Sequence, residues 1–154
     1  MIIINTNNLN EARKQIEKAK KEKPTEEIAL LSQEDEFNRK ALEIKNLNIF
    51  IINENLDIKD YSKQRNSSLN EVLSKIAKEN NIKIAIRIEE IIKKDTKEKA
   101  KALARLAQNI MLTKKAGTKL VFLKENKELD KHSLQALLLT LGASTKQAQE
   151  AISN

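Results

Sequence analysis

Short apolar runs alternate with longer amphipathic stretches along this chain of 154 residues. The runs are rich in isoleucine and predict strands over 2–4, 28–31, 49–52, 82–88 and 120–123. The run 82–88 is apolar on nearly both faces, which is typical of a parallel strand covered by helices. Between the runs, apolar residues recur at helical spacing and predict helices over 9–23, 34–46, 68–80, 97–116, 133–141 and 144–153.

Helix-capping signals mark the ends of several of these segments. The stretch 66–88 is the most informative, because Ser68 and Glu71 have the spacing of a capping box and Asn80-Asn81 is suited to end a helix. Other expected caps are Asn7 or Asn8, Asp95 or Thr96, Gly117 and Ser144. The residues Ile91-Ile92 form a small apolar step before the loop 93–96.

Alternating strands and helices predict an α/β fold with a parallel sheet of about five strands. Five strands are too few for a complete eight-stranded barrel, so we expect a reduced or partial TIM-like barrel, open at its edges. No proline- or serine-rich linker interrupts the chain, which predicts a single domain over 1–154.

Composition narrows the class of protein. Charged residues make up 33% and hydrophobic residues 40%, a globular balance. There is no cysteine, which suits a reducing cytoplasm. No apolar run is long enough to span a bilayer, and the first residues lack the pattern of a signal peptide, so we expect a cytoplasmic protein without a membrane partner.

Positive charge is concentrated in the later part of the chain. Residues 1–60 carry 10 Lys/Arg and 12 Asp/Glu, whereas residues 61–154 carry 19 and 10, a net of +9. Such asymmetry favours a polyanionic partner. A lysine-rich composition that places lysine on every solvated surface explains the charge equally well, and this alternative stays open.

Few residues suit catalysis. His132 is the one histidine and opens a short helix, so we interpret it as a surface or capping residue. Two glycines in all exclude a glycine-rich phosphate loop. Glu89-Glu90 follow a strand, where barrel enzymes hold catalytic groups, but without a third ligand we expect them to be solvated. We therefore predict no catalytic residue and no metal ligand.

Four segments in order carry a resemblance to a known family. They are Asn38–Glu43 (NRKALE), 67–81 (SSLNEVL, then AKENN), 104–117 (ARLAQNI, then TKKAG) and 136–142 (ALLLTLG). Together they resemble archaeal ribonuclease P protein component 3, a relative of the eukaryotic thirty-kilodalton subunit, over about residues 36–154. The chain departs from the family at its amino-terminal part, which lacks one or two βα units, at Ala116, and at the turn Lys124–Glu128.

The resemblance implies a subunit of the ribonucleoprotein endonuclease that removes 5′ leaders from precursor tRNA. In that family the RNA subunit, with Mg²⁺, cleaves the phosphodiester, and this chain alone is expected to be non-catalytic and to bind no cofactor. The implied partners are ribonuclease P RNA, protein component 2 and the other ribonuclease P proteins, with precursor tRNA contacted indirectly.

Basic residues are the candidates for contact with RNA phosphates. We select those in the loop before 68, at a strand end, on the long helix and in the matched segments: Arg39, Lys63, Arg65, Arg87, Lys101, Arg105, Lys114 and Lys115. We expect Asn38, Asn70 and Asn109 to order the backbone. Tyr61 is the one well-placed aromatic residue, so we expect recognition of RNA shape and backbone.

Two other functions remain open. A reduced metal-dependent phosphoesterase of the histidinol-phosphatase-like type would need a cluster of metal ligands, which the sequence does not supply. An α/β domain with an incidental basic surface would bind neither RNA nor a protein partner.

Overall fold

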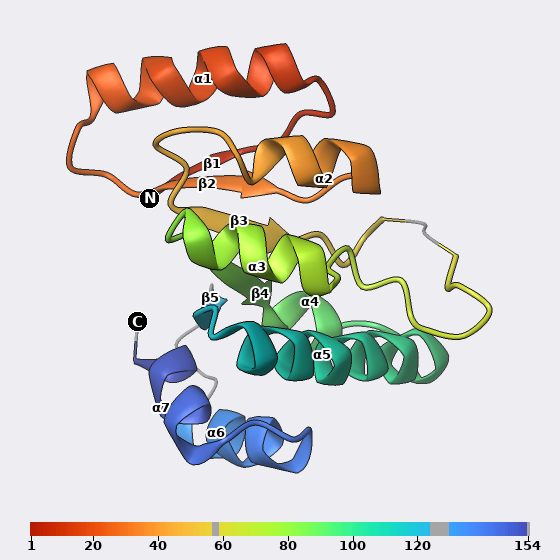
Figure 1. Cartoon of the computed structure of the whole chain (residues 1–154). Coiled ribbons are helices and arrows are strands. Elements are labelled where there is room, and N and C mark those ends of the chain that lie inside the picture. Colours follow the sequence, from red (N-terminus) through yellow and green to blue (C-terminus); the bar gives the residue numbers. More distant parts are fainter. Residues whose placement is uncertain (57–58, 124–129, 154) are drawn as a thin grey trace.

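Five parallel strands form one sheet in the order β1-β2-β3-β4-β5 (Figure 1). The computed structural model describes residues 1–56, 59–123 and 130–153. The strands are β1 (Ile2–Ile4), β2 (Ile28–Leu31), β3 (Ile49–Ile52), β4 (Lys83–Arg87) and β5 (Leu120–Leu123). In the described residues β1 and β5 each have one strand neighbour, so the sheet is not closed. The predicted α/β fold with five parallel strands is confirmed.

Helices follow each strand and line the sheet from one end to the other. They are α1 (Leu9–Glu22), α2 (Asp35–Ala41), α3 (Glu71–Glu79), α4 (Ile88–Ile92), α5 (Thr96–Ala116), α6 (Lys131–Thr140) and α7 (Thr145–Ile152). Figure 1 shows α1 and α2 beside β1 and β2, and α6 and α7 at the opposite end beyond β5. No helix in the described ranges is long and apolar enough to cross a membrane.

Apolar side chains bury both faces of the sheet. Leu30, Phe50 and Ile84 point to the helix side and belong to the larger core with α1, α3 and α5. Their neighbours in the strands form a smaller cluster on the other face: Ala29, Leu31, Ile49, Ile51, Ala85 and Val121. Successive side chains of a strand point to opposite faces of the sheet, so one run of β-branched residues contributes to both apolar clusters.

Several predicted helix ends are confirmed. Asn8 Oδ1 accepts from the amides of Asn10 and Glu11, and Asp95 accepts from the amide of Glu98. Gly117 ends α5 with a φ of 72°, a left-handed conformation that glycine adopts without strain. Ser144 caps α7 as predicted.

The predicted capping box at Ser68 is wrong. Ser68 has a φ of 56°, and Asn70 is the cap of α3, since its Oδ1 accepts from the Leu73 amide at 2.9 Å. The helix therefore begins at Glu71, and Val72 in its first turn is 57% exposed although its spacing fits the apolar stripe of the predicted helix.

Three other segments differ from prediction. The helix expected over 34–46 ends at Ala41, and Asn46 takes a left-handed φ of 67° before β3. The apolar step at Ile91-Ile92 is part of the short helix α4. Helix α6 begins at Lys131 with Asp130 as its cap, so His132 is its second residue and not its opening one. The turn Lys124–Glu128 lies outside the described residues. Strand β5, which precedes it, occupies its predicted span.

Candidate nucleic-acid interface

The loop between β3 and α3 lies against α5, and Asp60 joins the two. Its Oδ2 pairs with Arg65 Nη1 at 2.8 Å, and its Oδ1 accepts from Arg105 Nη2 at 3.2 Å and from the Asn66 amide at 2.9 Å. Burial opposes ionisation of Asp60, but these donors outweigh it, so the pKa of Asp60 lies below its usual value. One carboxylate thus holds two arginines in fixed positions.

Buried amides complete the attachment of this loop. Gln108 Nε2 donates to Arg65 O and to Ser67 Oγ, each at 2.9 Å, and Asn109 Nδ2 donates to Ser67 O at 3.3 Å. Asn38, which is fully buried on α2, bonds both the amide and the carbonyl of Gln33. Together with the cap at Asn70, these bonds give all three selected asparagines a role in ordering the backbone.

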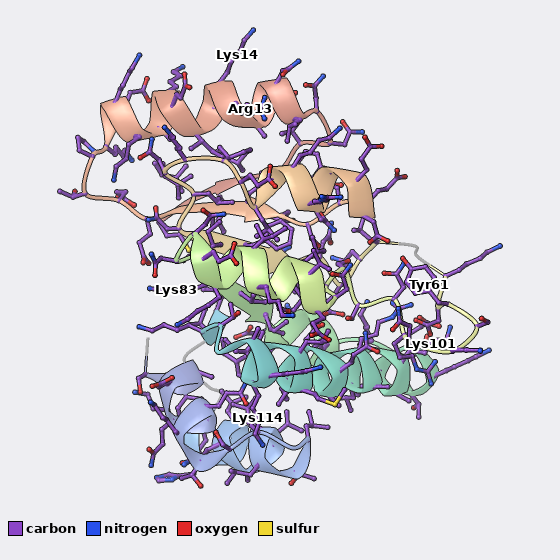
Figure 2. The ribbon with its side chains drawn as sticks, in the orientation of Figure 1. Arg13, Lys14, Tyr61, Lys83, Lys101 and Lys114 are labelled. Atoms are coloured by element: carbon purple, nitrogen blue, oxygen red, sulfur yellow. The ribbon has the colours of Figure 1, made fainter. Side chains whose placement is uncertain are left out.

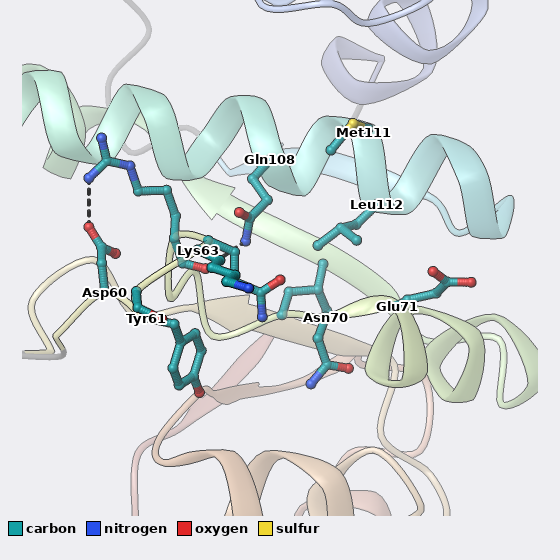
Figure 3. Close-up of a pocket in the computed structure, with 12 residues that line it drawn as sticks. Asp60, Tyr61, Lys63, Asn70, Glu71, Gln108, Met111 and Leu112 are labelled. Carbon is teal, nitrogen blue, oxygen red and sulfur yellow. Dashed lines mark hydrogen bonds and ion pairs between the residues drawn. The ribbon is translucent and has the colours of Figure 1, made fainter.

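A wide cavity of about 650 Å³ lies between the loop, the start of α3 and the middle of α5 (Figure 3). Its rim carries Lys63, Arg65 and the hydroxyl-bearing ring of Tyr61, which is 47% exposed. Its α5 wall includes Met111, which is 62% exposed. Tyr61 donates its hydroxyl to Asp35 on α2, and this hydrogen bond raises the pKa of Tyr61. The cavity is polar and basic on one side and apolar on the other.

A smaller cavity of about 280 Å³ lies at the carboxyl end of β3, against the first turns of α5. Residues around it come from both segments: Glu54, Asn55, Leu56, Lys94, Glu98, Lys101, Ala102 and Arg105. Glu54 is 8% exposed, and burial raises its pKa to about 7 against the opposing charges of Lys94 and Arg105. Three cations and two carboxylates therefore surround one polar cavity.

The carboxylates Glu89 and Glu90, expected to be solvated, are not. Glu89 is 7% exposed, and Glu90 pairs with Arg87 at 2.9 Å with both side chains more than four-fifths buried. The reason is α4, which turns back directly after β4 and folds the two carboxylates inward.

The structure brings half of the predicted basic residues together. Lys63 and Arg65 border the wide cavity, and Lys101 and Arg105 line the small one (Figures 2 and 3). Asp60 pairs with Arg65 and with Arg105 and so joins the two groups. Lys115 lies further along α5, paired with Glu71 at 2.9 Å. We call the surface formed by Lys63, Arg65, Lys101, Arg105 and Lys115 the α5 face.

The other predicted residues lie elsewhere. Arg39 is exposed on α2 and lines neither cavity, and Arg87 is engaged by Glu90. Lys114 points toward the turn between α6 and α7, where its Nζ donates to Gly142 O at 3.4 Å (Figure 2). There it borders a third cavity with Lys119 and Lys146.

Asp60, Glu54 and Lys94 were missed by the sequence analysis. Glu54 had a usable signal, because it follows a buried strand, and ligands of open parallel sheets bind beyond the carboxyl ends of strands. Asp60 and Lys94 stand in polar loops without periodicity, and only the fold shows what they contact.

The fold is similar to that of a chain in archaeal ribonuclease P. The match is to a cryo-EM structure of archaeal ribonuclease P with mature tRNA, at a TM-score of 0.78 and 23% identity, and it covers 97% of this chain but 62% of that one. A crystal structure of an uncharacterized protein matches at a TM-score of 0.61 and 13% identity, over 95% of this chain and 36% of that one. At such identities the likeness establishes the fold alone. The sequence matches no protein-family model and no curated protein.

Metal-binding potential is limited in the residues that the structure describes. They contain no group of three or more His, Cys, Asp or Glu side chains placed to hold a metal ion. His132 is exposed on α6, far along the chain from Glu54, Glu89 and Glu90.

Proposed function

We propose that this chain is a protein subunit of ribonuclease P, equivalent to archaeal protein component 3. In this role it binds the catalytic RNA and stabilises its fold while the RNA, with Mg²⁺, removes 5′ leaders from precursor tRNA. The observation that carries the proposal is the structural likeness, over 97% of this chain, to a chain of archaeal ribonuclease P with mature tRNA. The four family-like sequence segments support the same subunit independently.

The α5 face supports a role in RNA binding. Asp60 holds Arg65 and Arg105 in place, while Lys63 is exposed and Lys101 is partly exposed. Guanidinium groups held in position beside lysines suit a phosphate backbone, because the arginines give geometry and the lysines give charge. Protein component 2 and the other ribonuclease P proteins are the proposed protein partners, in the cytoplasm.

Reconstitution tests the proposal. The chain is mixed with protein component 2 and a cognate ribonuclease P RNA, and 5′-leader cleavage of precursor tRNA is followed against Mg²⁺ concentration. We expect the chain to lower the Mg²⁺ requirement, since its cations replace part of the charge neutralisation that the RNA otherwise takes from Mg²⁺. An unchanged requirement, with no binding to the RNA or to protein component 2, would falsify the proposal.

Variants of the α5 face sharpen this test. Lys63→Met and Lys101→Met are better choices than alanine at Arg105, because Arg105 also holds the loop through Asp60. Lys14→Met on α1 removes the same charge at a distance and serves as the control (Figure 2). No observation in the described residues favours a metal-dependent phosphoesterase over the ribonucleoprotein subunit.

A further inference from the structure

Glu54, which lines the small cavity, carries an unsatisfied buried acceptor. Its side chain is more than nine-tenths buried, and within the described residues Glu54 Oε1 has no hydrogen-bond partner. A buried acceptor without a donor costs free energy, so a ligand that brings a donor to this atom gains more than it would on an open surface.

Two lysines, Lys94 and Lys101, line the same cavity. Lys94 Nζ donates to the Glu54 carbonyl at 2.8 Å, and Lys101 Nζ pairs with Glu98 at 2.8 Å. An ammonium group has three donors, so each lysine retains donors beyond these bonds. The lining of the cavity thus includes donors for an anion and one carboxylate that can accept from a hydroxyl.

We propose that this cavity binds one ribose-phosphate unit of an RNA strand, with the phosphate on Lys94 and Lys101 and the 2′-hydroxyl donating to the Glu54 carboxylate. The inference rests on the proposed RNA-binding function and adds to it a site that distinguishes RNA from DNA. The 2′-hydroxyl is the group by which proteins make that distinction.

The size and position of the cavity agree with this ligand. At about 280 Å³ it lies at the lower limit of ligand pockets, roughly 300 Å³, so it suits one sugar-phosphate unit better than a larger molecule. It lies beyond the carboxyl end of a parallel strand, where open α/β sheets bind ligands. The raised pKa of Glu54, caused by burial and by Glu90 and opposed by Lys94 and Arg105, is the expected property of a carboxylate that lacks a donor.

The test compares an oligouridine with its 2′-fluoro counterpart, which keeps the sugar conformation but cannot donate a hydrogen bond. Binding is measured by fluorescence anisotropy of the labelled strands. For the unchanged protein we expect the ribose form to bind about fivefold to tenfold tighter, the effect of one typical hydrogen bond. Glu54→Met removes the acceptor at similar volume, and the ratio of the two affinities should fall to about one.

Control variants separate the two halves of the site. Glu43→Met, at an exposed position just after α2 that does not line the cavity, should leave the ratio unchanged. Lys101→Met should weaken both strands and keep the ratio, because it contacts the phosphate; its side chain is 42% exposed, so the fold is retained. Far-ultraviolet circular dichroism of each variant checks the fold.

Three results would overturn the inference. One is an equal affinity of the unchanged protein for both strands, and another is a ribose preference that survives Glu54→Met. The third is Glu54-dependent binding of uridine 5′-monophosphate without binding of oligouridine, which would assign the cavity to a free nucleotide. Any of these, combined with a lowered Mg²⁺ requirement in reconstitution, rejects the cavity assignment and leaves the ribonuclease P proposal standing.

Discussion

At the scale of residues, two carboxylates after β3 are shifted in opposite directions. Glu54 is buried with one oxygen unsatisfied within the described residues, and its pKa rises. Asp60 receives donors from Arg65, Asn66 and Arg105, and its pKa falls. Deeper burial raises the pKa of Glu54, whereas the hydrogen bonds from Arg65, Asn66 and Arg105 lower the pKa of Asp60.

Glu54 makes stability depend on pH. Its pKa is 4.5 in the unfolded chain and about 7 in the folded one, so the folded state binds more protons between these values and stability falls as pH rises through them. Glu54→Gln removes this loss. We expect the variant to be about 2–3 kcal/mol more stable than the unchanged protein at pH 8, with a much smaller difference near pH 5, measured by urea unfolding. If the free energies of unfolding of the two proteins run parallel against pH, the prediction is wrong. Glu43→Gln is the control and should not change the pH dependence.

Asp60 has the opposite dependence. The pKa of Asp60 is lowered from 3.8 in the folded chain. Its contribution to the free energy of unfolding is therefore present above that value and is lost as pH falls through the folded pKa. We expect Asp60→Asn to reduce the free energy of unfolding by about 1–2 kcal/mol at neutral pH. Arg65→Met should cost less, because Arg65 is half exposed and Asp60 still holds Arg105. Equal losses for the two variants in urea unfolding would mean that Asp60 does not act on both arginines.

At the scale of elements, helix α3 shows how tertiary contacts choose among local signals. Ser68 and Glu71 have the spacing of a capping box, but Asn109 and Asn38 bond the carbonyls of Ser67 and Ser68 and hold that backbone outside the helix. Asn70 is then the first residue free to cap. Helix α2 is likewise ended at Ala41, where Asn80 Nδ2 reaches across from α3 to the Leu42 carbonyl at 2.9 Å.

The cap assignment is testable at Asn70. Asn70→Ala leaves the Leu73 amide without its side-chain acceptor and should lower the free energy of unfolding by about 1 kcal/mol. Asn70→Asp keeps an acceptor at the same position and favours the positive end of the helix dipole, so stability should be retained. Thermal unfolding followed by circular dichroism compares the variants. If alanine and aspartate behave alike, the side-chain cap contributes nothing.

At the scale of the whole molecule, positive charge is distributed unevenly. The excess of +9 over residues 61–154 comes from the half that forms α5 and its facing loop, while α1 and α2 belong to the acidic half. Figure 1 places these halves at opposite ends of the sheet. A polyanion is therefore attracted to one end of the molecule.

Salt dependence measures this polarity. If Lys101 contacts a phosphate, Lys101→Met should reduce the slope of log affinity for ribonuclease P RNA against log salt concentration by about one unit. Lys14→Met, on α1, should leave the slope unchanged. Filter binding over a range of KCl concentrations gives both slopes. An equal change of slope in the two variants would mean that affinity depends on the net charge of the whole chain and not on contacts at the α5 face.

The sequence by itself determined the alternation of strands and helices, the parallel sheet, the long helix and its end at Gly117, and it narrowed the cap at the start of that helix to Asp95 or Thr96. These depend on hydrophobic periodicity and local capping, which are properties of neighbouring residues. The tertiary structure alone decided which basic residues meet, that Arg87 is taken up by Glu90, and that Glu54 is buried beside Lys94. The contact between Glu54 and Lys94 joins residues 40 positions apart, and Arg87 meets Glu90 only because α4 turns back after β4. Periodicity carries no information on them, because they arise from how the elements pack.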